Sequence, residues 1–195
     1  MIESKLISKA LFADKSFNSL EELKVHIGIK SCASMNQTHS NKIISAKKSG
    51  TYKSDGIFTL KKNLGLVVKT ADCMPIFLKD KTSIGAVHIG WRGIKNKIIN
   101  NALKNFNLNE LLMSIGPHAQ SCCYEVKDDV SKYLYEYIDK REGKEYLNMS
   151  QSLIDLSNKI GFKLEVSSIC TICDSSYNSY RENKTSKRQY GIIWK

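Results

Sequence analysis

Short apolar runs rich in β-branched residues, separated by polar turn residues, restrict the fold of this chain more than any other feature. Runs of about four to eight such residues are typical of strands, whereas helices need longer periodic segments. A strand at 111–115 is predicted to end at Gly116-Pro117. The other predicted strands are 43–46, 56–60, 64–69, 75–78, 83–89, 163–168 and 190–194.

Three segments are predicted to form helices. Segment 94–106 has apolar residues at helical spacing. Segment 127–139 has two acidic residues in its first turn, where they complement the helix dipole. Ser150 or Ser152 would begin a third helix, which runs to Lys159 and is stopped by Gly161.

Strands and helices are thus mixed, with strands dominating the first half. The length of 195 residues suits one domain, 1–195, with a single core. We therefore predict an α/β (α+β) fold, a mixed-sheet sandwich with flanking helices, whose strand order the sequence does not give.

Nothing in the sequence predicts a membrane segment or an export signal. No run of about 18 or more apolar residues exists, and charged residues interrupt the first nine positions. We expect a cytoplasmic protein, in which the six cysteines stay reduced. Metal binding, catalysis or burial are then the alternatives for these cysteines.

The formal net charge of +11 raises the question of a nucleic-acid partner. Of the 30 basic residues only four are arginine, and the lysines are spread along the whole chain. This distribution indicates a compositional bias rather than a binding surface, so no nucleic-acid partner is expected.

Three candidate metal ligands stand at expected strand ends or in loops. His39 lies in a polar loop, Cys73 follows one apolar run, and His88 closes another. Imidazole nitrogen and thiolate sulfur are good zinc ligands, and three of them leave a fourth position open. Their spacing matches no short metal motif, so core packing remains the alternative from the residues alone.

Polar residues beside these ligands are candidates for catalysis. Asp55 precedes a predicted strand and Asp72 precedes Cys73, so either carboxylate could orient a ligand or move a proton. A turn or capping role is the alternative for both. Arg92, between Trp91 and a glycine, offers a fork that suits phosphate, with a surface ion pair as the alternative.

The other cysteines give a weaker signal. Cys170-x-x-Cys173 could be a redox pair or half of a zinc site. No second such motif exists, and the adjacent pair Cys122-Cys123 is a poor substitute for one. We therefore interpret these four cysteines as packing residues.

Several motifs, in order from about residue 36 onward, resemble the YfiH-like family, also called the laccase-domain or polyphenol oxidoreductase family. The similarity is spread over most of the chain, which makes it specific. The matching segments are 37–39 (Gln-Thr-His), 54–59 (Ser-Asp-Gly-Ile-Phe-Thr), 70–75 (Thr-Ala-Asp-Cys-Met-Pro), 87–93 (Val-His-Ile-Gly-Trp-Arg-Gly), 115–117 (Ile-Gly-Pro), 122–126 (Cys-Cys-Tyr-Glu-Val), 170–171 (Cys-Thr), 179–181 (Ser-Tyr-Arg) and 188–189 (Arg-Gln).

The resemblance implies a YfiH-like laccase-domain fold with zinc held by His39, Cys73 and His88. It also implies phosphorolysis of adenosine, inosine, guanosine and methylthioadenosine, together with adenosine deamination. In the first reaction phosphate attacks C1′ as the purine leaves, and in the second zinc-activated water attacks C6 of adenine. Arg92 is then the candidate phosphate contact, and Asp72 or Asp55 the candidate proton carrier.

The sequence departs from the family pattern in two places. Segment 1–35 lacks the Gly-rich opening of the family, so substrate binding could be weaker or different. His118 and Ala119 stand where the family has a small residue and then isoleucine. His118 is therefore either a further functional histidine or a solvent-facing loop residue.

Two alternative functions stay open. The same ligand set with Met74 nearby would suit a mononuclear copper redox protein active on phenols. The chain has four histidines in total, too few for the combined copper centres of a true multicopper oxidase. The other alternative is a protein that binds nucleosides without turning them over.

Overall fold

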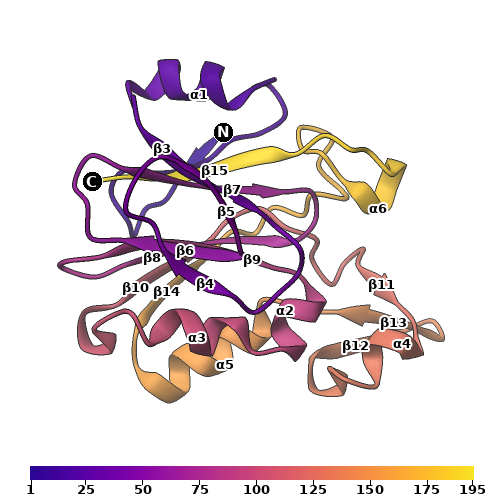
Figure 1. Ribbon diagram of the computed structural model, residues 1–195. Helices are drawn as coiled ribbons and strands as arrows, with labels where there is room; N and C mark the ends of the chain where they lie inside the picture. Colours follow the sequence, from indigo (N-terminus) through magenta and orange to yellow (C-terminus); the bar gives the residue numbers. More distant parts are fainter.

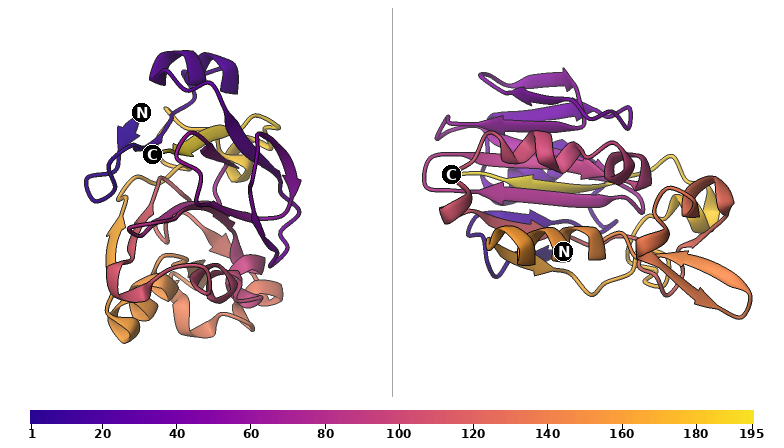
Figure 2. Two further views of the ribbon diagram at one scale, coloured as in Figure 1. Left: turned by 60° about the vertical axis from the view of Figure 1, so that its left-hand side comes forward. Right: turned by 90° about the horizontal axis from the view of Figure 1, so that it is seen from below.

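Two six-stranded β-sheets lie face to face in the computed structural model, which describes residues 1–195. A small third sheet stands at one end (Figure 1). The views of Figures 1 and 2 show helix α1 (Leu20–Ile27) outside the first sheet, and α2, α3 and α5 outside the second. The predicted mixed-sheet sandwich with flanking helices is therefore confirmed.

The first sheet joins the two ends of the chain. Its last strand in sequence, β15, is central and pairs with β2 on one side and with β7 on the other, antiparallel to both. Strand β3 pairs parallel with β7 and β5. In spatial order the sheet contains β1 (Ile2–Glu3), β2 (Ala10–Phe12), β15 (Gln189–Ile193), β7 (Gly65–Thr70), β3 (Cys32–Asn36) and β5 (Gly50–Lys53).

The second sheet carries the most buried hairpin of the protein. Strands β8 and β9 pair antiparallel, with Pro75 opposite His88, and every residue of β9 is buried. In spatial order this sheet contains β14 (Lys163–Val166), β10 (Leu112–Ile115), β8 (Met74–Lys79), β9 (Ile84–Ile89), β6 (Gly56–Thr59) and β4 (Ile43–Ser45). The third sheet contains β11 (Glu125–Val126), β13 (Lys144–Leu147) and β12 (Ile138–Arg141).

Apolar side chains fill three layers, the smallest of which lies between α1 and the first sheet. One cluster, including Met35, Leu66 and Phe77, lies between the two large sheets, where Phe77 stacks on Phe12 at 4.6 Å between ring centroids. A larger cluster, including Ile98 and Leu153, lies between the second sheet and its helices. Burial of these side chains supplies the main driving force for folding.

The predicted helix at 94–106 is two short helices. Helix α2 (Trp91–Lys95) and helix α3 (Ile98–Leu103) are separated at Lys97, whose φ of 53° is left-handed. The break turns α3 so that Ile98 and Ile99 are buried against the core. Tertiary packing therefore overrides the continuous helical pattern.

The predicted helix at 127–139 is wrong beyond its first turn. Helix α4 covers Asp128–Ser131, the 3₁₀-helix η2 covers Tyr135–Tyr137, and strand β12 begins at Ile138. Pairing of β12 with β13 replaces the helix, because the ladder satisfies the backbone of both strands.

Helix α5 (Gln151–Ile160) confirms the third prediction. Ser150 stands at its N-cap position, and Gly161 ends it in the left-handed conformation, with φ of 93°. The short helices η1 (Leu108–Glu110) and α6 (Tyr180–Asn183) were not predicted.

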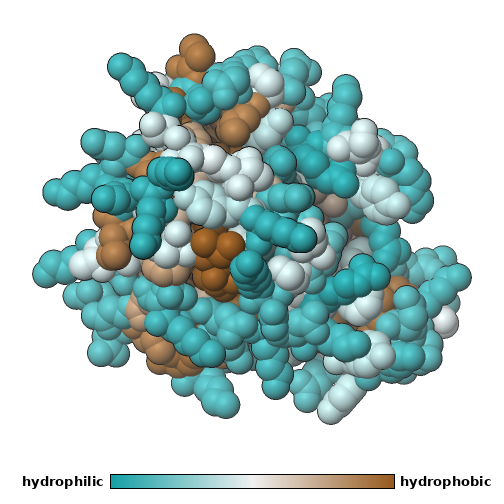
Figure 3. All heavy atoms as spheres, in the orientation of Figure 1, coloured by the Kyte–Doolittle hydropathy of each residue, from teal (hydrophilic) through white to brown (hydrophobic).

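All eight predicted strands are present, with ends shifted by one or two residues. The strands that were not predicted are β1 to β3 in the first 36 residues, β5, and the three strands of the third sheet. The face in Figure 3 is mostly hydrophilic, with apolar side chains in small separate groups. None of the helices combines the length and the apolar character that crossing a membrane requires.

Candidate metal centre and its pocket

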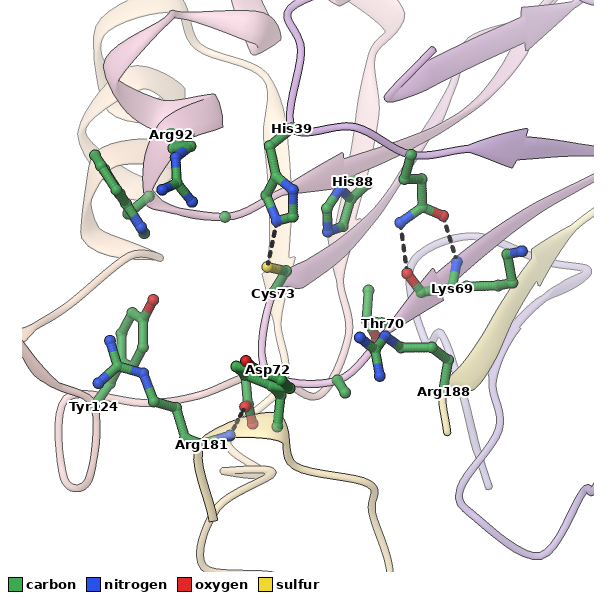
Figure 4. Close-up of a pocket in the computed structure, with 15 residues that line it drawn as sticks. His39, Lys69, Thr70, Asp72, Cys73, His88, Arg92, Tyr124, Arg181 and Arg188 are labelled. Atoms are coloured by element: carbon green, nitrogen blue, oxygen red, sulfur yellow. Dashed lines mark hydrogen bonds between the residues drawn. The ribbon is translucent and has the colours of Figure 1, made fainter. Parts of the chain in front are cut away.

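The three predicted ligands lie together. One ligating atom of each of His39, Cys73 and His88 lies within 4.8 Å of the other two. The Cys73 Sγ is 3.9 Å from the His39 Nε2, and the two imidazole rings meet edge to face at 4.9 Å (Figure 4). The loop after β3, the turn after β7 and strand β9 thus converge on one point.

Asp55, fully buried just before β6, fixes two of these ligands. Its Oδ1 accepts hydrogen bonds from the His88 Nδ1–H and from the His39 N–H, both at 2.9 Å. Its Oδ2 accepts from the backbone N–H and the hydroxyl of Ser40, both at 2.7 Å, and from the Thr38 N–H at 3.1 Å. These bonds hold His39 in a left-handed conformation, with φ of 59°.

The hydrogen bond from His88 decides which of its nitrogens is free. With Nδ1–H donated to Asp55, the Nε2 of His88 is the atom left to bind a metal. Burial raises the pKa of Asp55, but the hydrogen bonds from His88, Ser40 and Thr38 outweigh it and keep that pKa well below its usual range. A buried negative charge therefore stands directly behind the ligands.

The centre favours a thiolate at Cys73. Burial raises the pKa of its thiol, yet the neighbouring imidazoles of His88 and His39 outweigh burial and lower it to about 6. The pKa of His88 is raised instead, because the Cys73 thiolate and Asp55 outweigh its burial. A divalent cation bound here would replace the proton that His88 carries, so the residues fit a metal ion.

Gly90, between β9 and α2, lies so close to Cys73 that a side chain there would clash with it. A Cβ at this position would lie 2.7 Å from the Cys73 Sγ and 3.6 Å from the His39 Cδ2. No side chain fits there without displacing the thiol, so the position beside the centre requires glycine.

A pocket of about 450 Å³ opens beside the three ligands. Four cationic side chains and three large aromatic ones line it, so it suits an anionic or polar ligand with a flat ring. Arg92 lies 4.5 Å from the Trp91 ring centroid, and Arg181 lies 4.7 Å from that of Tyr124. Besides the ligands, the lining residues include Lys69, Arg92, Arg181, Arg188, Trp91, Tyr124, Tyr180 and Asp72.

Asp72 joins the β7–β8 turn to the C-terminal part of the chain. Its Oδ1 accepts from the Thr171 hydroxyl at 2.9 Å and its Oδ2 from the Arg181 N–H at 2.7 Å. Its φ of 86° is left-handed, and these bonds hold the strained backbone in place. The structure thus places Asp72 at the pocket wall, whereas Asp55 lies behind the ligands and outside the pocket.

Comparison with known proteins places this architecture in a family. The profile described as multi-copper polyphenol oxidoreductase laccase matches residues 16–195. The chain belongs to that family. The predicted resemblance is confirmed, and the family's description agrees with a metal-binding role for the His39, Cys73 and His88 centre.

Curated relatives of this laccase-family chain carry one enzyme name. A protein of Aquifex aeolicus named purine nucleoside phosphorylase is 35% identical over 158 residues, which cover 78% of this chain and 77% of the relative. A protein of Borreliella burgdorferi with the same name is 31% identical, covering 73% of this chain and 69% of the relative.

Solved structures of two other proteins have the same fold. YlmD of Geobacillus stearothermophilus has a TM-score of 0.84 at 18% identity and covers 98% of this chain and 94% of its own. YfiH of Bacillus licheniformis has a TM-score of 0.80 at 24% identity, covering 89% and 79%. The YfiH-like laccase-domain fold that the sequence predicts is therefore confirmed.

Sequence reasoning gave no role to Arg181, Arg188 or Tyr124, although all three lie in or beside the motifs of the laccase family. The scarcity of arginine was the available signal, since three of the four arginines line this one pocket. Gln37, also in a motif, exchanges two hydrogen bonds with the backbone of Lys69, at 2.7 and 3.0 Å, and so fixes the loop before His39.

His118 is buried, so the prediction that it could be a solvent-facing loop residue is wrong. Its Nδ1–H donates to the Gly116 carbonyl at 2.8 Å, while its Nε2 has no partner. It lies outside the pocket. Burial lowers the pKa of His118 to about 4, despite its hydrogen bond to the Gly116 carbonyl, so the ring is neutral near pH 7.

Proposed function

We propose that the protein is a zinc-dependent purine nucleoside phosphorylase of the cytoplasm. The reaction joins the ribosyl C1′ to a phosphate oxygen and releases the purine, giving a free base and ribose 1-phosphate. One observation carries the proposal, namely a cluster of three candidate metal ligands that opens onto a pocket with four cations. The names of the relatives support the reaction class.

The pocket has the properties that a nucleoside and a phosphate need. Its volume of about 450 Å³ lies within the usual range for small-molecule sites. Trp91, Tyr124 and Tyr180 offer faces on which a purine can stack. These rings favour the base, and the surrounding cations favour the phosphate, so substrates such as adenosine, inosine, guanosine and methylthioadenosine remain the proposed ones.

Arg92 is the proposed phosphate contact. Its guanidinium makes no hydrogen bond to the protein and is held only against the Trp91 ring. Arg181 donates to the Glu125 carbonyl, and Arg188 to the carbonyls of Thr185 and Lys187, so both are partly engaged. Arg92 therefore keeps the largest free set of donors for a bidentate contact.

His39, Cys73 and His88 would hold the zinc ion. When bound, the ion supplies a Lewis-acidic positive charge beside the substrate. Asp55 holds the Nδ1 proton of His88 and keeps its ring oriented. Copper is less well supported, because Met74, the candidate axial ligand, is buried in the core cluster beneath the second sheet.

Asp72 is the proposed proton carrier. A departing purine takes up a proton, and a carboxyl group at the pocket wall can deliver it. Asp72 lines the pocket, whereas Asp55 does not, so we assign Asp55 to positioning. The phosphorylase proposal thus gives the two carboxylates separate roles.

Adenosine deamination is a second proposed activity of the same site. Water replaces the exocyclic amine at C6, giving inosine and ammonia. Zinc deaminases combine a three-ligand centre with a nearby carboxylate that moves protons. The position of Asp72 at the pocket wall, next to Cys73 in the chain, supports this assignment.

Purified protein without a histidine tag, incubated with adenosine and phosphate, tests both activities. Phosphate-dependent release of adenine and ribose 1-phosphate would establish phosphorolysis, and inosine formed without phosphate would establish deamination. Bound nucleoside without any product would contradict both and identify a binding protein. Copper with phenol oxidation would instead favour the redox alternative.

The role of Arg92 has its own test. Arg92→Ala is expected to raise the KM for phosphate by about 10-fold or more, while zinc content stays unchanged. Lys159→Ala, which removes an exposed cation of α5 outside the pocket, is the control and should leave that KM unaltered. An unchanged phosphate KM in Arg92→Ala would contradict the assignment.

A further inference from the structure

Four of the six cysteines meet in one place outside the centre described above. The Sγ atoms of Cys122, Cys123, Cys170 and Cys173 all lie within 4.8 Å of one another. The Cys173 Sγ is 3.5 Å from that of Cys122 and 2.8 Å from that of Cys123. The packing role predicted for these residues does not explain why four thiols from two distant segments converge.

Two tight turns bring the thiols together. Residues 121–123 form one turn and residues 171–173 the other, and a parallel bridge between His118 and Cys170 holds the turns side by side. The Thr171 N–H donates to the His118 carbonyl at 3.1 Å, and the Gln120 side chain donates to the Ser167 carbonyl at 3.0 Å. Hydrogen bonds around the thiols therefore bring the two turns together.

A backbone N–H group points at the most buried of the four sulfurs. The Gln120 N–H donates to the Cys170 Sγ at 3.4 Å. The backbone beside the cluster thus offers a donor to a thiolate at Cys170.

We propose that Cys122, Cys123, Cys170 and Cys173 form a second metal site, which binds one zinc ion through four thiolates. Zinc–sulfur bonds of about 2.3 Å place tetrahedral thiolates about 3.8 Å apart. The sulfurs are already within 4.8 Å, so small side-chain rotations bring all four to that spacing. Four protein ligands leave no open position, which is typical of a structural site.

Charge and protons balance in this site. Binding releases four thiol protons, and the zinc ion with four thiolates has a net charge of about −2. Two cations stand close enough to offset it. Arg141 donates to the carbonyl of Ser121 in the first turn, and Arg181 lines the same surface hollow as Cys123 and Ile172.

The second site would hold one wall of the pocket. Tyr124, which follows Cys123 directly, lines the pocket, and Thr171, which follows Cys170, donates to Asp72. An ion that joins the two turns therefore fixes two residues of the pocket from outside. This inference concerns metal content and stands independently of the proposed phosphorylase activity.

Metal content per chain, measured on tag-free protein purified with a reductant, tests the site. We expect about two zinc ions in the unmodified chain and about one in Cys173→Ser or Cys122→Ser, which change exposed thiols. Cys73→Ser should also retain about one, and the double variant with Cys173→Ser about none. Cys32→Ser, a change far from both clusters, is the control and should retain both ions.

Cobalt supplies a second readout. The cobalt-loaded chain should show intense thiolate-to-metal charge-transfer absorption, most of which Cys173→Ser removes and Cys73→Ser keeps. Thermal melting of each variant confirms that it is folded. Two zinc ions with this pattern but no phosphorylase activity would uphold the second site and reject only the proposed function.

Two results would overturn the second site. In the first, the unmodified chain holds at most one ion, and Cys173→Ser leaves the metal content unchanged. In the second, mass spectrometry of the protein as purified with reductant, without removal of metal, finds a disulfide between Cys123 and Cys173, which would consume two of the four ligands.

Discussion

The protein carries two clusters of ligating side chains that differ in composition and in surroundings. His39, Cys73 and His88 combine nitrogen and sulfur, face a pocket of about 450 Å³ and have the buried Asp55 behind them. The cluster of four cysteines has sulfur alone, lies outside that pocket and accepts the Gln120 N–H at the Cys170 Sγ.

The number of ligands and their surroundings distinguish a catalytic metal site from a structural one. Three ligands leave a position at which a substrate can approach, whereas four thiolates close the coordination shell. Strands and strand ends supply the first cluster, and two surface turns supply the second. Substitutions in the first should therefore affect activity, and those in the second should affect stability.

Loss of His88 is expected to have the largest effect. His88→Ala removes a ligand and leaves Asp55 buried without its imidazole partner. We expect phosphorylase kcat/KM to fall more than about 100-fold, because changes to outer partners alone cost about 10- to 100-fold. His26→Ala, an exposed change in α1, is the control. Full activity in His88→Ala would contradict the assignment of activity to the His39, Cys73 and His88 cluster.

Cys173→Ser should act on stability. A ligand that binds only the folded chain contributes about 4 kcal/mol when present at about 1,000 times its Kd. We therefore expect a lower melting temperature in this variant and no further decrease on adding a chelator that strips the cysteine cluster. Cys32→Ser should still respond to the chelator, as the unmodified protein does. Identical melting of both variants would argue against a structural ion.

The pH dependence of stability tests the burial of His118, which lies outside both clusters. Burial lowers the folded-state pKa of His118 from 6.5 to about 4, so between these values the unfolded chain binds a proton that the folded chain does not. Stability is then complete above pH 6.5 and falls by about 3 kcal/mol as the pH drops toward 4.

His118→Asn should reduce this acid sensitivity, measured by urea unfolding at a series of pH values. His26→Asn, which changes an exposed histidine of α1, is the matched control. An unchanged slope in His118→Asn would show that the buried ring is not its source.

Asp55→Asn should give the smallest effect. The amide keeps the size of the carboxylate but loses its charge and presents a donor where five donors now point. We expect zinc to bind the first cluster about 10- to 100-fold more weakly, with no change at the cysteine cluster. Competition with a chromophoric chelator measures both affinities, and equal weakening at both sites would indicate general unfolding.

Local composition predicted much of this fold. The strands within 64–89 could be predicted because each is a short apolar run, a signal that does not require knowledge of its pairing partner. The prediction of a helix at 127–139 is wrong after Ser131. The segment ends in β12, which pairs with β13, and the local pattern gives no information about that partner. The short strands β1 and β2 were missed because two or three residues are too few for a periodic signal.

The candidate site shows the same limit. His39, Cys73 and His88 could be chosen from donor chemistry and from their places at strand ends. The cysteine cluster could not, because its turns lie about 50 residues apart and meet only through the bridge of His118 and Cys170. Arg181 and Arg188 were visible in motifs, but their convergence on the pocket depends on the path of the C-terminal segment.

The central position of β15 has a consequence for synthesis on the ribosome. Strand β2 can join the rest of its sheet only through β15, which is translated after every other strand of that sheet. The first sheet therefore cannot close until β15 has left the ribosome. Arg181 and Arg188 are translated shortly before β15, so a nascent chain has neither a finished sandwich nor a finished pocket until that strand is released.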